Sequence, residues 1–268
     1  MIKIFVGFRY YLQLIFSHIK MTTIYILWLR QLKRYVRSRS RMIGSLAQPL
    51  LFLVALGFGF GPVFQKAGQG NYMNFLVPGI IGMSIIFSAV FSGMEIIWDR
   101  QFGFLKETLV APVSRFNIML GRTLGGATMS LMQGLIVFFI SMFFGFRPEN
   151  WYLFRILLLL MLLVALLFTA LGTMITCLLE DMQGFQLIVN FLIMPLFFLS
   201  GAIFPLTGLP KIMSVISSLD PLAYGIDSFR VILTGSTQFG LHIDVLVLSV
   251  VTVIFLSLGS YFFSKIQV

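Results

Sequence analysis

The sequence predicts an all-α integral membrane protein with six transmembrane helices. Hydrophobic residues make up 59% of the 268 residues and charged residues only 10%, whereas soluble domains carry about 25% charged residues. Six stretches are long and apolar enough to cross roughly 30 Å of hydrocarbon. No long polar stretch remains that could form a soluble domain. We therefore expect a cytoplasmic N-terminal segment over residues 1–41 and a six-helix transmembrane domain over residues 42–268.

The N-terminal segment is strongly basic, with nine cations and no acid. Beside a membrane span, this pattern indicates orientation of the chain and attraction to anionic lipid rather than nucleic-acid binding. Residues 1–20 begin like a secretory signal peptide, but Arg9 and His18 interrupt the apolar stretch and no small-residue cleavage site follows. We expect this stretch to be retained.

Residues 21–41 predict an amphipathic helix at the membrane interface. Apolar residues recur at spacings of three and four, and cations fall mainly on the opposite side. The apolar set is Ile24, Leu27, Trp28, Leu32 and Tyr35, and the basic set is Arg30, Lys33, Arg34, Arg37 and Arg41. Such a helix is suited to lipid headgroups, although a simple topology signal or a calmodulin-type target shows the same pattern.

The six predicted spans follow in order along the chain. They cover about residues 42–60, 75–94, 123–146, 151–179, 185–203 and 243–263. Gly121, Gly125 and Gly126 are expected to loosen the start of the third span, and Pro195 to kink the fifth by removing a main-chain donor. Prolines and glycines break residues 204–241, which predicts short re-entrant or interfacial helices on the outer side.

A stripe of serines runs along the second span. Ser84, Ser88 and Ser92 recur every four residues, so they share one helix face. Small polar residues are common where membrane helices pack together, and helix packing is the simpler explanation. The alternative is that the stripe forms one wall of a substrate path.

Positive residues predict the orientation. The segments assigned to the inner side carry 14 cations and those assigned to the outer side carry five. The positive-inside rule therefore places both termini in the cytoplasm.

A charged segment at residues 98–122, WDRQFGFLKETLVAPVSRFNIMLGR, connects the second and third spans. The residue before Pro112 is biased away from helix, so the segment predicts a short cytoplasmic helix followed by a turn. If residues 104–115 were all helical they would span roughly 18 Å, enough to bear on another protein. From the residues alone, an ordinary charged loop is the simpler interpretation.

The same segment resembles one family. The run FGFLKETLVAPVSR, followed by Gly121 and Arg122, resembles the segment after the second span in ABC-2 type transporter permeases, most of all their drug-exporter, daunorubicin-resistance-like branch. Many members have Gly-Thr-Leu-Glu where this chain has Gly-Phe-Leu-Lys at 103–106, which leaves Glu107 as the nearest acidic contact. FLSGAIFPL at 198–206 and DPLAYGIDSFR at 220–230 also match, and the resemblance covers residues 21–263.

The resemblance implies a division of labour between subunits. In this family the segment is a coupling helix that docks in a cleft of the ATPase, and two permeases pair with two ATPase copies in a cell membrane such as the bacterial inner membrane. ATP and Mg would bind to that partner, and cargo would pass between the permeases. The implied docking residues are Phe104, Lys106, Glu107, Leu109, Pro112, Val113, Ser114 and Arg115, with Arg30 and Arg34 of the amphipathic helix.

The sequence offers no catalytic motif. There is no phosphate-binding loop, because GRTLGGAT lacks the lysine, and no G-x-S-x-G. Cys177 is the single cysteine, and His18 and His242 are far apart, so no metal-ligand spacing exists. We therefore expect no enzyme activity, cofactor or metal in this chain. Span interiors carry almost no ionisable residue, which argues against an ion-coupled carrier.

Two classes of function remain. The first is the permease subunit of an ATP-driven exporter of amphiphilic drug-like or lipidic cargo, with export of lipid-linked polysaccharide as the alternative within this class. The second is a non-transporting membrane anchor or an intramembrane enzyme. The second class would need ionisable groups that converge inside the membrane, and the sequence shows no such pattern.

Overall fold

The computed structural model describes residues 21–66, 71–110, 113–206 and 210–266, and of Arg41 the main chain only. Within these ranges the chain is helical and contains no strand. The elements are α2 (Met21–Arg37), α3 (Arg39–Lys66), α4 (Tyr72–Ser92), α5 (Met94–Gln101), α6 (Phe104–Val110), α7 (Arg115–Phe143), the 3-10 helix η1 (Trp151–Leu153), α8 (Phe154–Leu178), α9 (Met182–Leu199), α10 (Lys211–Leu219), α11 (Pro221–Thr234) and α12 (Leu241–Ser264).

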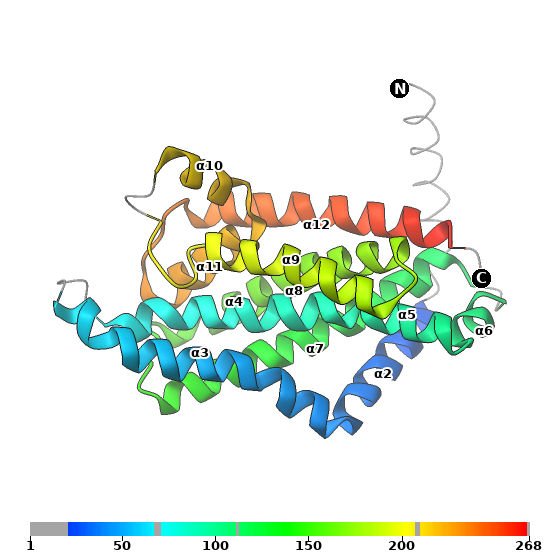
Figure 1. Ribbon diagram of the computed structural model, residues 1–268, viewed down its shortest axis with the longest axis horizontal. Helices are drawn as coiled ribbons and strands as arrows, with labels where there is room; N and C mark the ends of the chain where they lie inside the picture. Colours follow the sequence, from blue (N-terminus) through cyan, green and yellow to red (C-terminus); the bar gives the residue numbers. More distant parts are fainter. Residues whose placement is uncertain (1–20, 67–70, 111–112, 207–209, 267–268) are drawn as a thin grey trace.

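Among the described residues, six helical stretches are long and apolar enough to cross a membrane. They are α3, α4 continued by α5, α7, η1 continued by α8, α9 and α12, which confirms the predicted fold class. The helices run roughly along the long axis of the bundle (Figure 1). The helices α5 and α6 and the last turn of α12 lie at one end, which we call the α6 end. The helices α10 and α11 lie towards the other end, which we call the α10 end.

The core of the bundle is built around α4, α7 and α8. Most of α4 and α8 is buried, whereas α3, α9 and α12 keep broad apolar faces uncovered in the single chain. The main chains of α4 and α8 come very close: a Cβ added to Gly172 would lie 2.5 Å from the Val90 carbonyl oxygen, and one added to Gly93 would lie 2.7 Å from the Gly172 carbonyl. Glycine at these crossings permits the tight packing that membrane helices use in place of a hydrophobic driving force.

The broken stretch after α9 contains two short helices, α10 and α11, as the predicted short helices of this stretch required. Asp220 caps α11 by accepting a hydrogen bond from the Leu222 N–H at 2.8 Å, and Pro221 occupies the first turn. The helix α11 is buried against α4, α8 and α12 rather than lying on the surface. Buried Asp227 holds the following loop by accepting from the Phe239 N–H at 2.9 Å.

Two expectations for the third span differ from the structure. The third span begins at Arg115, eight residues before the predicted start at Thr123, because the Ser114 side chain accepts from the Asn117 N–H and caps the helix there. Its glycines do not loosen it: α7 is continuous, and Gly121 and Gly125 are contact points for α2.

Candidate functional site

The segment between α5 and α7 forms a short helix that presents its side chains outward. Gly103 turns the chain with φ +80°, and α6 then runs for seven residues, about 10 Å. Phe104, with 52% of its surface exposed, lies on the exposed side with Lys106 and Glu107. Leu105 is fully buried. The helix is shorter than the dozen residues considered from the sequence.

The Leu105 side chain anchors α6 to a small apolar cluster. Its buried members come from α5, α6, α7 and the end of the chain: Ile96, Leu105, Ile118, Met119, Phe263 and Ile266. Leu109 and Val113, both predicted to dock a partner, are half-buried against this cluster. Their side chains therefore hold α6 in place as well as facing outward.

The last predicted docking residues bind within the chain. Ser114 is exposed and caps α7, and Arg115 donates to the main-chain carbonyls of Ser264 at 2.6 Å and Ile266 at 3.0 Å. Arg115 thereby ties the start of α7 to the end of α12. Pro112 lies outside the described residues.

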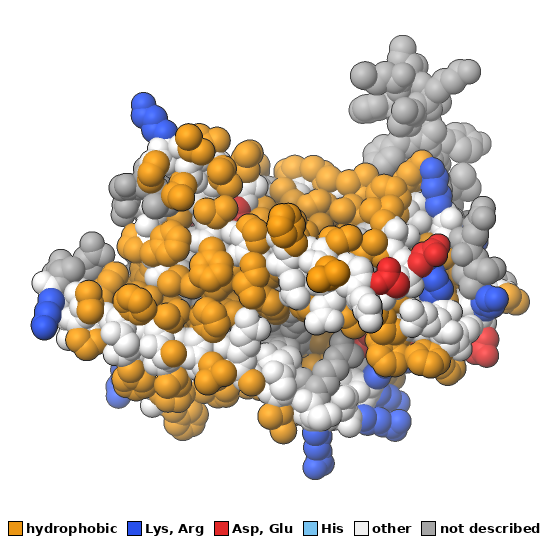
Figure 2. All heavy atoms as spheres, in the orientation of Figure 1, with side chains coloured by type: hydrophobic (Ala, Val, Ile, Leu, Met, Phe, Trp, Pro, Cys, Tyr) orange, Lys and Arg blue, Asp and Glu red, His pale blue; other side chains and the backbone are white. Residues whose placement is uncertain are grey.

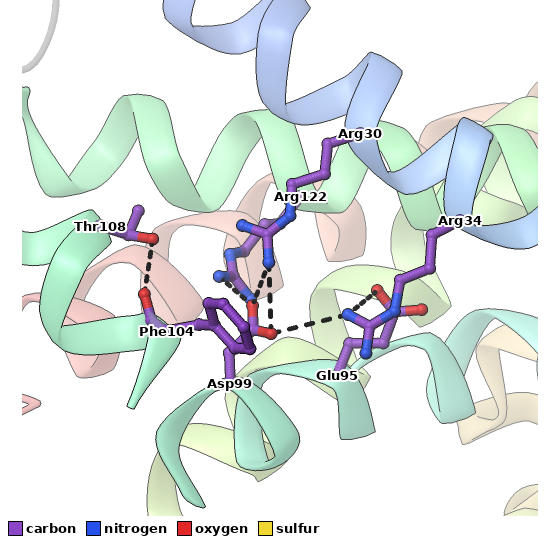
Figure 3. Close-up of polar contacts among 7 residues, drawn as sticks. All are labelled: Arg30, Arg34, Glu95, Asp99, Phe104, Thr108 and Arg122. Carbon is purple, nitrogen blue, oxygen red and sulfur yellow. Dashed lines mark hydrogen bonds and ion pairs between the residues drawn. The ribbon is translucent and has the colours of Figure 1, made fainter. Parts of the chain in front are cut away.

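Beside α6, five charged side chains meet in what we call the Asp99 cluster (Figure 3). Its members are Arg30 and Arg34 of α2, Glu95 and Asp99 of α5, and Arg122 of α7. Arg122 donates to Asp99 Oδ2 at 2.5 Å, and Arg30 Nη2 lies 3.4 Å from Asp99 Oδ1. Arg34 Nη1 lies 3.6 Å from Asp99 Oδ1 and 3.8 Å from Glu95 Oε2.

Burial makes this cluster a structural joint. Glu95, Asp99 and Arg122 are almost completely buried, whereas the Arg30 and Arg34 side chains keep 42% exposure. A buried charge is costly unless it is paired, so Asp99 strongly favours conformations in which α2 and α7 both reach it. The cluster therefore joins α2, α5 and α7 immediately before α6. The sequence pointed to Arg30 and Arg34 as contacts for a partner, and the structure pairs both with acids of their own chain.

The helix α2 lies directly on α7. A Cβ added to Gly125 would come within 2.6 Å of Gln31 Cβ, and one added to Gly121 within 3.0 Å of the Ile24 carbonyl oxygen. Trp28 donates its indole N–H to Thr128 Oγ1 at 2.9 Å. The predicted amphipathic helix is present, and its apolar face covers α7 while its cations remain exposed.

Two open grooves flank α6. The first, of about 1050 Å³, is lined by cations of α2 and α3 together with Asp99 and Phe104. The second, of about 730 Å³, lies between α6 and the end of α12 and includes Lys106, Arg115 and Lys265. Basic and acidic side chains are most numerous at this end of the molecule (Figure 2). The arrangement offers an exposed helix between positively charged recesses.

The serine stripe divides into two parts. Ser84 is buried between helices and donates to the Ile81 carbonyl at 2.8 Å. Ser88 and Ser92 line a cavity of about 410 Å³ between α2, α3, α4 and α7. Gln133 of α7 lines the same cavity and was missed, although it is the single amide side chain between residues 123 and 146.

The described residues contain no group of three or more His, Cys, Asp or Glu side chains that could hold a metal ion. Cys177 is half-buried beside the Leu105 cluster. The site therefore consists of the exposed side of α6, which can contact another protein, and the paired charges of the Asp99 cluster.

Comparison with known proteins gives the family. The model of the ABC-2 type transporter family matches residues 22–234. The transport permease ycf38 of Pyropia yezoensis is 33% identical over 228 residues, which cover 81% of this chain and 75% of that relative. The inner membrane transport permease YadH of Escherichia coli is 29% identical over 219 residues, 80% of this chain and 83% of YadH. Nodulation protein J of Sinorhizobium fredii is 29% identical over 222 residues, 81% of this chain and 84% of that relative.

The match begins one residue into α2 and ends at the last residue of α11, so it includes the Asp99 cluster, α6 and five of the six candidate spans. Permeases of this family are membrane transport subunits rather than enzymes, and they normally work with an ABC ATPase. The order of spans, the helix after the second span and the matching relatives agree: this chain belongs to the ABC-2 type transporter family and is a multi-pass membrane permease subunit.

Proposed function

We propose that this chain is the permease subunit of an ATP-driven exporter and that a separate ATPase docks on α6. The observation that carries this proposal is the combination of outward and inward contacts at α6. Phe104, Lys106 and Glu107 face outward, while Leu105 and the adjoining Asp99 cluster fix the helix to the spans. A force applied to α6 would therefore reach α2, α5 and α7.

The excess of cations at the α6 end supports placing this end in the cytoplasm. ATP and Mg would then bind to the ATPase. Two permeases and two ATPases would form the working unit. Closure of the ATPases would push α6, and the Asp99 cluster would pass the displacement to α2 and α7. Coupling requires that the docked contact differ in free energy between two permease states.

The cargo in this proposal is amphiphilic, either drug-like or lipidic, and moves out of the cytoplasm. The cavity beside Ser88 and Ser92 supports this class, because its described lining combines aromatic and polar side chains and contains no charged one. A strongly charged cargo would find no counter-charge there.

Co-purification with the ATPase tests the docking surface. We expect Glu107→Arg to reduce the amount of ATPase recovered with the tagged permease by about tenfold, which corresponds to about 1.4 kcal/mol. Glu149→Arg is the matched control, because it makes the same charge reversal at an exposed position at the α10 end. Recovery that is equal for the two variants and the unaltered chain would remove α6 as the docking element.

Crosslinking tests which end of the permease contacts the ATPase. The single cysteine allows a background with Cys177→Ser, into which Glu107→Cys or Glu149→Cys is introduced. We expect a short bifunctional reagent to join the permease to the ATPase from position 107 and not from position 149. Crosslinking from position 149 alone would place the ATPase at the wrong end.

A further inference from the structure

The cavity beside Ser88 and Ser92 has the size and lining of a binding site. Its volume of about 410 Å³ lies within the 300–1,000 Å³ typical of small-molecule pockets. Tyr35 of α2 and Gly44 of α3 are among its walls; the ribbon shows these two helices meeting at an angle (Figure 1). Gly44 and Ser45 are exposed and form its rim, whereas Gln133 lies at its depth with 2% exposure.

The deepest polar group of this cavity is unsatisfied. Gln133 Oε1 is buried and has no hydrogen-bond partner among the described residues. A buried amide oxygen without a hydrogen bond is unfavourable, so a bound group that donates a hydrogen bond would be stabilised there. Around it, Phe87, Phe91 and Met129 present apolar surface.

The lining determines what can bind. Among the side chains that the structure describes, none that lines the cavity is charged, so a phosphate, sulfate or ammonium group would lose its hydration without a partner among them. A hydroxyl group donates and accepts, and therefore matches both an amide and the serine hydroxyls. An alkyl chain or apolar ring matches the aromatic side chains.

We propose that this cavity binds an uncharged, hydroxyl-bearing amphiphile, with the hydroxyl on Gln133 and the apolar body against Phe87, Phe91 and Met129. The assignment of this molecule as cargo rests on the proposed export function, whereas its binding does not. Tyr35 follows Arg34 directly in α2, so a shift of the Asp99 cluster would also move one wall of the cavity. Occupancy and coupling would then be linked.

Photolabelling of the full chain in lipid nanodiscs tests this proposal without any ATPase. The probe is hexadecanol with a diazirine on its alkyl chain. The matched probes are its methyl ether, which accepts but does not donate a hydrogen bond, and its sulfate, which is charged. We expect the alcohol to label peptides from α4 and α7 at least fivefold more strongly than either matched probe. Equal labelling by the ether or the sulfate would overturn the assigned chemistry.

Two variants with matched controls locate the site. A Cβ added to Gly44 or to Gly59 meets no described atom within 4 Å, but only Gly44 lines the cavity. We expect Gly44→Leu to reduce labelling at least fivefold and Gly59→Leu to leave it unchanged. Gln133→Leu should abolish the preference for the alcohol over the ether, whereas Gln186→Leu, at an exposed position of α9, should keep it.

The outcomes separate the two proposals. Labelling that is the same in Gly44→Leu and Gly59→Leu, with both proteins monodisperse on size exclusion, would overturn the cavity whatever the co-purification shows. Labelling that follows the expected pattern, together with equal ATPase recovery for Glu107→Arg, Glu149→Arg and the unaltered chain, would uphold the cavity and reject α6 as the docking element.

Discussion

Asp99 is the side chain on which the site depends most. It is 3% exposed and receives Arg122 from α7 and Arg30 and Arg34 from α2. A buried carboxylate of this kind needs a counter-charge, because the free-energy cost of its desolvation is not offset by uncharged contacts. The acid therefore fixes the position of two other helices relative to α5, and α6 follows α5 directly.

Asp99→Asn should destabilise the permease. The substitution leaves the Arg122 guanidinium buried without its closest counter-charge, and breaking such a pair typically costs 3–5 kcal/mol. We expect a clear fall in the melting temperature measured by fluorescence-detected size exclusion. Glu180→Gln, at an exposed position, is the control. The double variant Asp99→Leu with Arg122→Met should recover part of the loss, because it removes both charges. No difference between Asp99→Asn and the control would contradict the role of the cluster.

Asp220 predicts a pH dependence at the α10 end. Burial raises the pKa of this carboxyl to about 7, although its hydrogen bond from the Leu222 N–H acts in the opposite direction. In the unfolded chain the pKa is about 3.9. The folded chain thus holds this proton more tightly than the unfolded chain does. The contribution of Asp220 to the free energy of unfolding is therefore complete below about pH 4 and is lost as the pH rises through about 7.

The effect of Asp220 is measured by comparing the melting temperatures of the unaltered chain and of Asp220→Asn at several pH values. The melting temperature of the unaltered chain should fall by several degrees, relative to that of Asp220→Asn, between pH 4.5 and pH 8. Asparagine also caps a helix N-terminus, so the cap is kept while the titration is removed. Parallel curves for the two chains would show that this carboxyl does not titrate in that range.

At the scale of the element, α2 is a packed helix rather than a loose interfacial one. Gly121 and Gly125 allow its main chain to approach α7, and the Trp28 indole N–H bonds Thr128. The same helix carries the cations of the groove beside α6. Packing and charge on one helix explain why its sequence alternates so regularly between apolar and basic residues.

Gly125→Val tests this packing. The new side chain would collide with Gln31, and overpacking of this kind typically costs 1–3 kcal/mol. We expect a lower melting temperature and faster proteolysis at the basic residues of α2. Gly59→Val is the control, because a Cβ there meets no described atom within 4 Å. If the two variants digest at the same rate, α2 is not held by this contact.

At the scale of the whole molecule, the bundle has two chemically distinct ends. Most cations and the two basic grooves beside α6 lie at the α6 end, whereas the α10 end contains short helices held by buried polar contacts. Between them, α3, α9 and α12 keep uncovered apolar faces, as expected for helices in contact with lipid or with another permease.

Cysteine labelling of intact cells would establish the orientation. In the Cys177→Ser background, a membrane-impermeant maleimide should label Glu149→Cys and fail to label Glu107→Cys until the cells are opened. The expectation follows from the excess of cations at the α6 end. Labelling of Glu107→Cys in intact cells would reverse the topology and remove the coupling proposal.

The sequence by itself determined the class, the six spans and the position of α6. Apolar stretches and charge asymmetry act locally, and each can be recognised within about twenty residues. It also identified the stripe of Ser88 and Ser92, although not which of its serines line a cavity.

Only the tertiary structure decided how the charges are used. Arg30 and Arg34 face Asp99 and Glu95, which are 61 or more residues away in the chain, and no local pattern relates them. The cavity with Gln133 likewise requires four helices to meet. Spans follow from how each segment transfers into lipid, whereas pairing and cavities follow from which segments pack together.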